Sequence, residues 1–353
     1  MAKIIVDIVS PYGGREGGIE DVIRAWTKNL NMDLFDLRVM HMTPGIAYLD
    51  GYTKAYFLKG DSENVDPSYC ASGYNLFLSE LGAPDICIAT NTPFMTLSCD
   101  KVRNHIGSNM VLFSWVHSEI QRYEERGQGG IDEMLCADRH LVINSSMEHE
   151  IHAKSPEAII YDVGNPILHE LPNVTTPPIP NKMAYVGRLS EEKRLDIVLE
   201  AMYKAKSDWM LDIIGDGPIR NEIEGWIKLL KLDNRVRILG WKNNPLEYIT
   251  DASFLICASD FEGFMIAGAE ALAMGKPVIA TPTQGLMEYL KDSENGYFFN
   301  FGDADSLVAI LDDISSRKKA IPDSEICRNT VNRFMSENYF KTIENILLNS
   351  VKK

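Results

Sequence analysis

Short apolar runs alternate with helix-like segments along the whole chain, and this alternation constrains the fold more than any other feature. The runs that resemble buried strands are 4–9, 37–41, 86–89, 110–115 and 140–143 in the first half, and 183–186, 210–214, 236–239, 254–258 and 277–280 in the second. Continuous apolar strands that alternate with helices are typical of parallel sheets covered by helices on both faces. Two successive series predict an α/β chain with two Rossmann-like, doubly wound domains.

A proline-rich stretch marks the boundary between the two series. Residues 165–181 contain Pro166, Pro172, Pro177, Pro178 and Pro180. Such a stretch is expected to form a semi-rigid linker. A chain of 353 residues also exceeds what one hydrophobic core usually holds. The predicted domains are therefore residues 1–166 and 167–332, and residues 333–353 are expected to form a terminal helix.

Charge and composition exclude several classes of function. The formal net charge is −15 with a pI near 5.0, and residues 1–170 hold 13 Lys and Arg against 24 Asp and Glu. This predicts no nucleic-acid partner and at most weak association with anionic membranes. No apolar run has the length of a membrane helix, and the start of the chain resembles a strand rather than a signal peptide. The six cysteines form no CxxC pair, so we expect a cytoplasmic protein with reduced thiols, either free in the cytoplasm or peripheral at the inner face of the membrane.

Two glutamates eight residues apart, Glu262 and Glu270, follow the apolar run 254–258. Gly263 stands where a tight turn into a helix is expected, and the alanine-rich residues after it favour that helix. A helix N-terminus attracts anions, so a phosphate there would leave the two carboxylates to hold hydroxyl groups of the same ligand. A sugar nucleotide fits this description. The alternative is that the glutamates belong to an ordinary helix, on which such spacing is common.

Other predicted strands of the second half also end in glycine or polar residues. Arg188 and Lys193 follow the strand 183–186, where two cations would clamp a diphosphate, although a solvated charged loop is the alternative. Three further strand ends carry residues 215–218, Trp241 and residues 283–288, and Trp241 is either a base-stacking residue or a packed surface aromatic. Because the carboxyl ends of parallel strands meet at one sheet edge, these loops together predict a pocket.

The first half offers weaker signals. Residues 13–18 form a glycine-rich loop after the first strand, in which Gly14, Gly17 and Gly18 allow close approach to a phosphate, but the G-x-G-x-x-G fingerprint of nicotinamide enzymes is absent. His117 ends the strand 110–115 and is either a site residue or structural. His149 and His152 lack the spacing of a metal site. The poorly periodic stretch 44–79 is either an insertion that faces an acceptor or a variable loop.

Several of these motifs together resemble glycosyltransferase family 4, whose members are retaining enzymes of the GT-B fold. The resemblance rests on 187–189 with Lys193, 215–218, 262–264 with 270–272, and 275–279, and more weakly on 17–20 and His117. Residues 113–117 and 136–138 are similar to bacterial lipopolysaccharide-core galactosyltransferases. The resemblance implies two domains facing a central cleft, with the acceptor bound by residues 1–166, the nucleotide sugar by 167–332, and the terminal helix crossing back to the first domain.

The resemblance also implies a role for each candidate residue. Arg188 and Lys193 would hold the donor diphosphate, and His117 would face the transferred sugar. The carboxylate of Glu262 and the backbone of Gly263, Phe264 and Met265 would meet the donor sugar. Glu270 would bind the ribose, and the loop with Gly14, Gly17 and Gly18 would close near the phosphates. Many members have proline where this chain has Met265, which leaves the donor hexose open.

The expected activity is transfer of a hexose, galactose or glucose, from a UDP-sugar to a growing cell-surface glycan or glycolipid such as lipopolysaccharide core. We expect retention, no cofactor beyond the UDP-sugar substrate, and no metal or Asp-x-Asp metal motif. The leaving diphosphate would take the acceptor proton. The alternatives are a sugar-nucleotide epimerase or phosphorylase on the same fold, or a non-catalytic partner of a transferase. The missing fingerprint disfavours a nicotinamide oxidoreductase.

Overall fold

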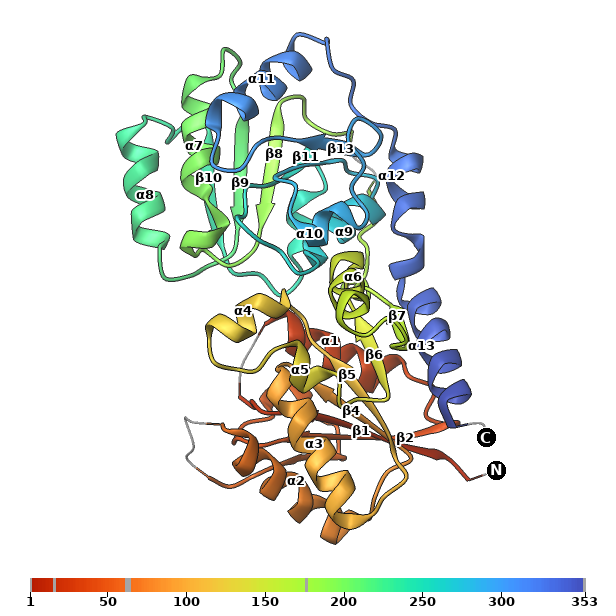
Figure 1. Ribbon diagram of the computed structural model, residues 1–353. Helices are drawn as coiled ribbons and strands as arrows, with labels where there is room; N and C mark the ends of the chain where they lie inside the picture. Colours follow the sequence, from red (N-terminus) through yellow and green to blue (C-terminus); the bar gives the residue numbers. More distant parts are fainter. Residues whose placement is uncertain (1, 15–16, 61–64, 175–176, 352–353) are drawn as a thin grey trace. The chain divides into compact units, whose positions relative to one another are not determined.

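The computed structural model describes residues 2–14, 17–60, 65–174 and 177–351, and the chain forms two compact units (Figure 1). The first unit consists of Met1–Pro166 together with Ser336–Lys353, and the second of Ile167–Met335. Each unit holds one parallel sheet with helices packed against it. Two Rossmann-like α/β units are the predicted fold class, and this prediction is confirmed.

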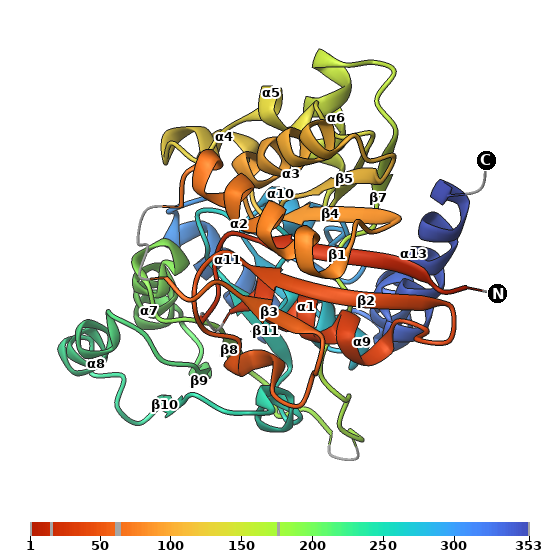
Figure 2. The same cartoon turned by 90° about the horizontal axis from the view of Figure 1, so that it is seen from below.

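The sheet of the first unit has seven parallel strands in the order β3-β2-β1-β4-β5-β6-β7. Figure 2 shows β3, β2, β1, β4 and β5 side by side in this order. The strands are β1 Ile4–Ser10, β2 Phe35–His41, β3 Ala55–Phe57, β4 Ile86–Thr90, β5 Val111–Trp115, β6 Arg139–Val142 and β7 Ile160–Asp162. The strand order reverses direction between β1 and β4, because the chain moves outward from β1 to β3 and then returns to β4. The loops after β1 and β4 therefore lie at the position where doubly wound sheets bind ligands.

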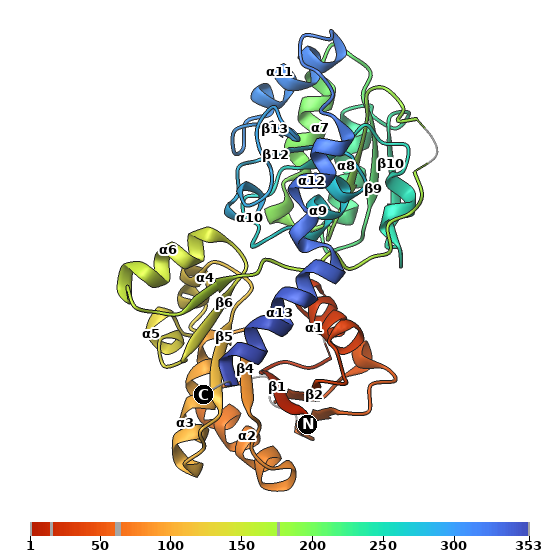
Figure 3. The ribbon, with the colours of Figure 1, turned by 90° about the vertical axis from the view of Figure 1, so that its right-hand side faces the viewer.

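The helices of the first unit divide between the two faces of its sheet. They are α1 Gly18–Asn29, α2 Pro67–Leu81, α3 Pro93–Ile106, α4 Ile120–Glu125, α5 Ile131–Met134, α6 Ser145–Lys154 and α13 Ser336–Val351. The crossover from β1 through α1 to β2 and the crossover from β4 through α3 to β5 move toward opposite edges of the sheet. Because both crossovers are right-handed, α1 and α3 lie on opposite faces. The terminal helix α13 lies beside α1 (Figure 3), where the rings of Trp26 and Phe340 meet edge to face at 6.2 Å. The backbone N–H of Asn31 donates to Glu344, which fixes the same contact.

The second unit has six parallel strands in the order β10-β9-β8-β11-β12-β13. They are β8 Lys182–Val186, β9 Met210–Ile214, β10 Val236–Gly240, β11 Phe254–Cys257, β12 Val278–Ala280 and β13 Gly296–Phe298. The helices are α7 Leu195–Lys204, α8 Arg220–Leu229, α9 Ile266–Ala273, α10 Gln284–Met287, α11 Ala304–Ser315 and α12 Ser324–Thr330. One apolar core joins α7, α8 and α11 to the sheet, and Trp209 is a fully buried member of it. The direction of the chain reverses between β8 and β11, so the loops after these two strands open the ligand position of this sheet.

Several details of the sequence prediction were wrong. The three-residue strands β3, β7 and β13 were missed. The stretch 44–79 is not one loop: it contains the turn Ala47–Leu49, the edge strand β3 and most of α2, whose N-terminus is capped by Asp66. The terminal helix begins at Ser336 rather than at residue 333, since Asn332–Phe334 forms a separate turn. All six cysteines are free thiols.

Candidate functional site

The second unit brings Lys193 and Glu262 together at the point where its strand order reverses. Lys193 follows β8 and Glu262 follows β11, and these strands are neighbours in the sheet. The Lys193 ammonium donates to Oε1 of Glu262 at 2.7 Å, and the Ser259 hydroxyl donates to the same oxygen at 2.7 Å. Burial opposes the charge on Lys193, but the adjacent carboxylate outweighs burial and raises the pKa of Lys193 above its ordinary value. The two side chains therefore form a charged pair at the ligand edge of the sheet.

A second contact braces the same two loops. The backbone N–H of Asp260 donates to the carbonyl of Glu192 at 2.9 Å, and the Arg194 guanidinium donates to the Asp260 carboxylate at 3.3 Å. Arg194 has a left-handed backbone, with φ of 49°, at the residue before α7 begins. The loop after β8 is thus held to the loop after β11 by backbone and side-chain contacts, which fixes where Lys193 lies.

Glycines let the loop after β9 approach the loop after β8. A Cβ atom on Gly215 would lie 1.8 Å from the carbonyl oxygen of Gly187, and one on Gly217 would lie 2.2 Å from that of Leu189. Across this contact, Leu189 and Asp216 are joined by a backbone hydrogen bond of 2.9 Å. Only glycine fits such an approach, so the two loops form one continuous surface.

The Gly263–Met265 segment leads into α9, which begins at Ile266 rather than directly after Gly263. Met265 precedes the helix with a left-handed backbone, φ 57°, and no side chain caps the helix. The Tyr289 hydroxyl donates to the Met265 carbonyl at 2.7 Å, and the Gly285 N–H donates to the Glu262 carbonyl at 3.0 Å. Because a helix of eight residues leaves its first N–H groups without intrahelical partners, this N-terminus suits an anion.

Glu270 lies at the fifth residue of α9 and is 1% exposed. Its Oε1 accepts hydrogen bonds from the backbone N–H groups of Leu168 and His169 and from Nδ1 of His169, at 3.2, 3.1 and 2.8 Å. Sequence analysis singled out Glu270 but missed His169, whose contact joins positions 101 residues apart. No sequence signal connects the two residues, since the partner lies at the start of the unit.

Arg188 and Trp241 are exposed residues in two different strand-end loops of the second unit. Arg188 extends from the loop after β8, and its carbonyl accepts from the Tyr185 hydroxyl at 2.7 Å. Trp241 follows β10 and is 66% exposed. Of the two alternatives for Trp241, a packed surface aromatic does not describe a residue with two thirds of its surface open to solvent, and base stacking stays a prediction.

In the first unit the glycine loop after β1 packs against the loop after β2. The Gly13 N–H donates to Thr43 Oγ1 at 2.7 Å, and the Gly14 N–H donates to the Gly45 carbonyl at 2.5 Å. Gly17 is the residue before α1 and Gly18 is its first residue. Residues 15 and 16, in the middle of the predicted phosphate loop, lie outside the described residues.

His117 lies just beyond the end of β5, in the first unit. Its Nε2 is 2.9 Å from the Thr90 hydroxyl, and its ring packs on Trp115 with 4.4 Å between centroids. Burial lowers the pKa of His117 to about 3, so the ring is neutral near pH 7. Its Nδ1 is buried and has no hydrogen-bond partner in the described part of the chain. A neutral imidazole with one unused nitrogen suits a hydrogen bond to a ligand better than ion pairing.

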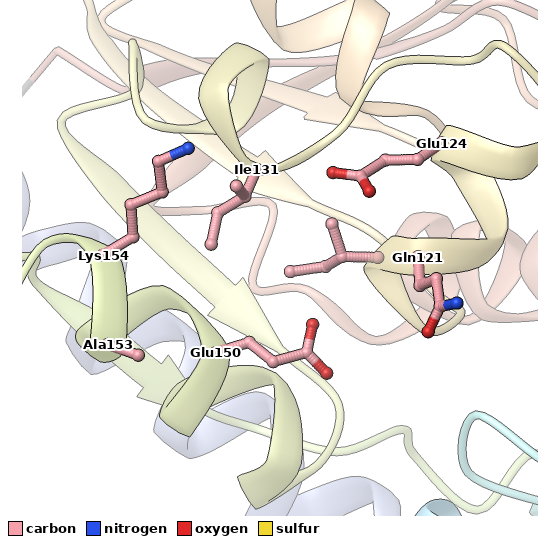
Figure 4. A pocket seen from close by; sticks show the side chains of 7 residues that line it. Gln121, Glu124, Ile131, Glu150, Ala153 and Lys154 are labelled. Carbon is pink, nitrogen blue, oxygen red and sulfur yellow. The ribbon is translucent and has the colours of Figure 1, made fainter.

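A cavity of about 410 Å³ lies on the first unit between α4, α5 and α6 (Figure 4). Figure 4 shows the Ile131 side chain between Lys154 and Glu124, and the carboxylate of Glu150 on the opposite side of the cavity from that of Glu124. Burial raises the pKa of Glu150, and the nearby Glu119 and Glu124 add to this effect. None of the predicted site residues lines this cavity.

The described residues contain no group of three or more His, Cys, Asp and Glu side chains arranged to hold a metal ion. The chain does contain one Asp-x-Asp triplet, Asp303-Ala304-Asp305, which the sequence analysis overlooked. Asp303 caps α11 by accepting from the Ser306 N–H at 3.0 Å, and Asp305 accepts from the Lys204 ammonium at 3.0 Å. Within the described structure, both carboxylates of this triplet therefore accept hydrogen bonds from groups of the protein itself.

The sequence profile of the Glycosyl transferases group 1 family matches residues 171–330. The chain carries a group 1 glycosyltransferase domain. This domain spans nearly the whole second unit, including β8, β11, α9 and the Lys193–Glu262 pair. The glycosyltransferase that contains it resembles lipopolysaccharide-core galactosyltransferases, as the sequence motifs predicted.

Two curated relatives align with this glycosyltransferase along almost its full length. The lipopolysaccharide 1,6-galactosyltransferase of Salmonella typhimurium is 27% identical over 371 residues, covering 99% of this chain and 99% of the relative. The enzyme of the same description from Escherichia coli is 26% identical over 368 residues, covering 99% of this chain and 98% of the relative.

Solved structures show the same GT-B fold. The apo form of the lipopolysaccharide outer core galactosyltransferase WaaB has a TM-score of 0.84 at 24% identity, with 98% of this chain and 100% of that one covered. HepE from Anabaena, solved with UDP-glucose, has a TM-score of 0.75 at 17% identity, with 98% and 99% covered. Among the described helices of this glycosyltransferase, none is long and apolar enough to cross a membrane.

Proposed function

We propose that this glycosyltransferase moves a hexose, galactose or glucose, from a UDP-sugar to a growing cell-surface glycan such as lipopolysaccharide core. The observation that carries the proposal is the Lys193–Glu262 pair at the reversal of strand order in the second unit. A cation and a carboxylate side by side suit a ligand that carries a diphosphate next to a sugar. Solved HepE structures contain UDP, UDP together with glucose, or UDP-glucose, which supports a UDP-sugar donor.

The donor is assigned to the second unit residue by residue. The Lys193 ammonium has three N–H groups and donates one of them to Glu262 in the described structure. The other N–H groups can donate to diphosphate oxygens. Arg188, exposed on the same loop, supplies a second cation. Glu262 and the backbone of Gly263–Met265 would contact the donor sugar, and Glu270 would bind the ribose.

Transfer is proposed to occur on one face of the donor sugar, with retention of configuration. The acceptor hydroxyl oxygen bonds to the anomeric carbon as the bond from that carbon to the diphosphate oxygen breaks. The acceptor proton passes to the departing diphosphate. Arg188, Lys193 and the N-terminus of α9 would stabilise the charge that develops on this leaving group. These groups would take the part that a divalent ion plays in metal-dependent transferases, so activity without a metal is proposed.

The acceptor is assigned to the first unit. The names of the two full-length relatives point to a lipopolysaccharide acceptor. The cavity between α4, α5 and α6 begins three residues after His117 and offers the carboxylates of Glu124 and Glu150 around an apolar floor. Carboxylates that accept from hydroxyls around an apolar floor suit a sugar ring, which has both polar edges and C–H faces. The charge of −15 argues that binding to anionic membranes is weak.

The proposal is tested first by a donor screen. UDP-galactose, UDP-glucose, UDP and GDP-mannose are compared by thermal shift, where a ligand at 100 times its Kd stabilises the folded chain by about 2.7 kcal/mol. We expect UDP and one UDP-hexose to raise the melting temperature and GDP-mannose to leave it unchanged. A chain that responds to no uridine nucleotide at millimolar concentration contradicts the proposed donor.

The reaction itself is followed with the donor that binds and lipopolysaccharide lacking its outer-core hexoses. We expect UDP release only when acceptor is present, activity that survives EDTA, and a new bond with the donor's anomeric configuration in early NMR spectra. Conversion of the UDP-hexose to another UDP-sugar without acceptor would instead identify an epimerase. An inverted product, or activity lost on chelation and restored by manganese, would refute the proposed mechanism.

A further inference from the structure

Only one of the two carboxylate oxygens of Glu270, Oε1, is hydrogen-bonded by the protein in the part of the chain that the structure describes. Oε1 accepts from the backbone N–H groups of Leu168 and His169 and from Nδ1 of the His169 ring. An ionised carboxylate only accepts hydrogen bonds, so the His169 ring carries its hydrogen on Nδ1. Three donors leave no lone pair of Oε1 for a further ligand. The other oxygen, Oε2, has no hydrogen-bond partner among the residues that the structure describes.

This arrangement fixes the carboxylate in rotation as well as in position. The terminal torsion of a glutamate is broad, so a carboxylate without such contacts samples many orientations. Here the helix α9 fixes the Cα of Glu270, while the backbone at Leu168 and His169 fixes Oε1. The His169 bond is the shortest of the three at 2.8 Å, and its ring is 32% exposed while the Glu270 side chain is 2% exposed.

From this geometry we infer that His169 is a positioning residue for nucleotide recognition, which holds Oε1 of Glu270 so that Oε2 is presented to the ribose hydroxyls. The inference rests on the proposed function, in which Glu270 binds the ribose of a uridine nucleotide. A purely structural explanation is that the bonds to Glu270 only anchor the first residues of the second unit. The two explanations differ in one measurable respect, because only the first couples His169 to the hydroxyl groups of the ligand.

The experiment compares UDP with 2′,3′-dideoxyuridine diphosphate, which lacks both ribose hydroxyls, by calorimetric titration of the full chain. The variants are His169→Leu, which removes the donor, and the pair His169→Asn and His169→Gln. The Asn amide nitrogen falls near the position of Nδ1 and the Gln amide nitrogen near that of Nε2. This pair keeps a polar side chain, so it tests the inference even where the apolar variant is poorly folded. Melting temperature is recorded for each variant.

We expect the native protein to bind UDP at least about tenfold more tightly than the dideoxy compound, since that compound offers no hydroxyl group to Oε2 of Glu270. His169→Leu and His169→Gln should reduce that preference at least threefold by weakening UDP alone, and His169→Asn should retain it. With the UDP-hexose, His169→Leu should raise KM and leave kcat within about twofold.

A preference for UDP over the dideoxy compound that is unchanged in His169→Leu or His169→Gln, or an equal loss of affinity for both nucleotides, overturns the role of His169. Absence of any preference in the native protein overturns the ribose assignment of Glu270, and with it this part of the proposed function.

Discussion

The Lys193 ammonium lies 2.7 Å from Oε1 of Glu262, although the two residues are 69 positions apart in the sequence. The adjacency of β8 and β11 places their loops side by side, so the topology of the sheet brings this cation to this carboxylate. The pair lies in a partly buried setting, with side-chain exposures of 19% and 13%. Charge changes at either position are therefore expected to affect the other.

The first prediction concerns the two cations of the loop after β8. Arg188→Ala and Lys193→Ala should each weaken UDP binding by about 1.5–3 kcal/mol, the contribution of a charge-assisted hydrogen bond. Lys193→Ala should be the more harmful, because it also leaves Glu262 without its cation. Lys228→Ala removes the same charge from an exposed position on α8 and is the matched control. Calorimetry with UDP decides the matter, and unchanged affinity in both loop variants would refute the diphosphate assignment.

The second prediction separates the two glutamates. Glu270→Gln should turn its amide oxygen toward the three N–H donors at Leu168 and His169, which leaves an NH₂ group where the ribose needs an acceptor. UDP affinity should therefore fall about tenfold, the loss of about 1.4 kcal/mol. Glu262→Gln should lower kcat with a smaller effect on UDP, because this carboxylate is assigned to the sugar. Parallel titration and turnover measurements check this, and an equal loss of UDP affinity in both variants would show that the division of roles is wrong.

Sequence patterns were sufficient to predict the two sheets and the strand ends that carry Lys193, Gly215 and Glu262, because buried strands are apolar runs and ligand loops follow them. They could not reveal the partner of Glu270. That contact depends on how the first residues of the second unit return to α9, and no local pattern records it. The backbone of Met265 was equally hidden, since a left-handed conformation at a non-glycine residue is set by its surroundings.

The third prediction concerns the glycine contact between the loops after β8 and β9. Gly215→Ala would place a methyl group 1.8 Å from the Gly187 carbonyl oxygen at a φ of 150°, so the loops must separate. We expect a loss of about 2–3 kcal/mol in unfolding free energy and weaker UDP binding. Gly225→Ala is the control, because this glycine lies within α8 and nothing surrounds its Cβ position within 4 Å. It should stabilise by up to about 1 kcal/mol. Denaturant titration measures both, and equal stability of the two variants would contradict the close approach.

A final prediction concerns acid stability and rests on buried histidines of the first unit. Burial lowers the pKa of His41 to about 4, of His117 to about 3 and of His140 to about 4. An unfolded histidine titrates near 6.5. As the pH falls below this value, the unfolded chain binds protons that the folded chain does not, so stability falls. Asp7 acts in the opposite sense, because burial raises its pKa to about 6 against the effect of Arg38, and the folded carboxyl takes up its proton first.

Three histidines oppose one carboxyl, so unfolding free energy should be lower at pH 5 than at pH 7, with each histidine contributing about 2 kcal/mol at most. His140→Asn removes one titrating ring but keeps an amide near the Nδ1 position, which lies 2.7 Å from the Ser114 hydroxyl. This variant should lose measurably less stability between pH 7 and pH 5 than the native chain. His149→Asn, at an exposed position on α6, should behave like the native chain. Denaturant titrations at both pH values give the comparison, and an identical loss in His140→Asn and the native chain would show that His140 is not held neutral by burial.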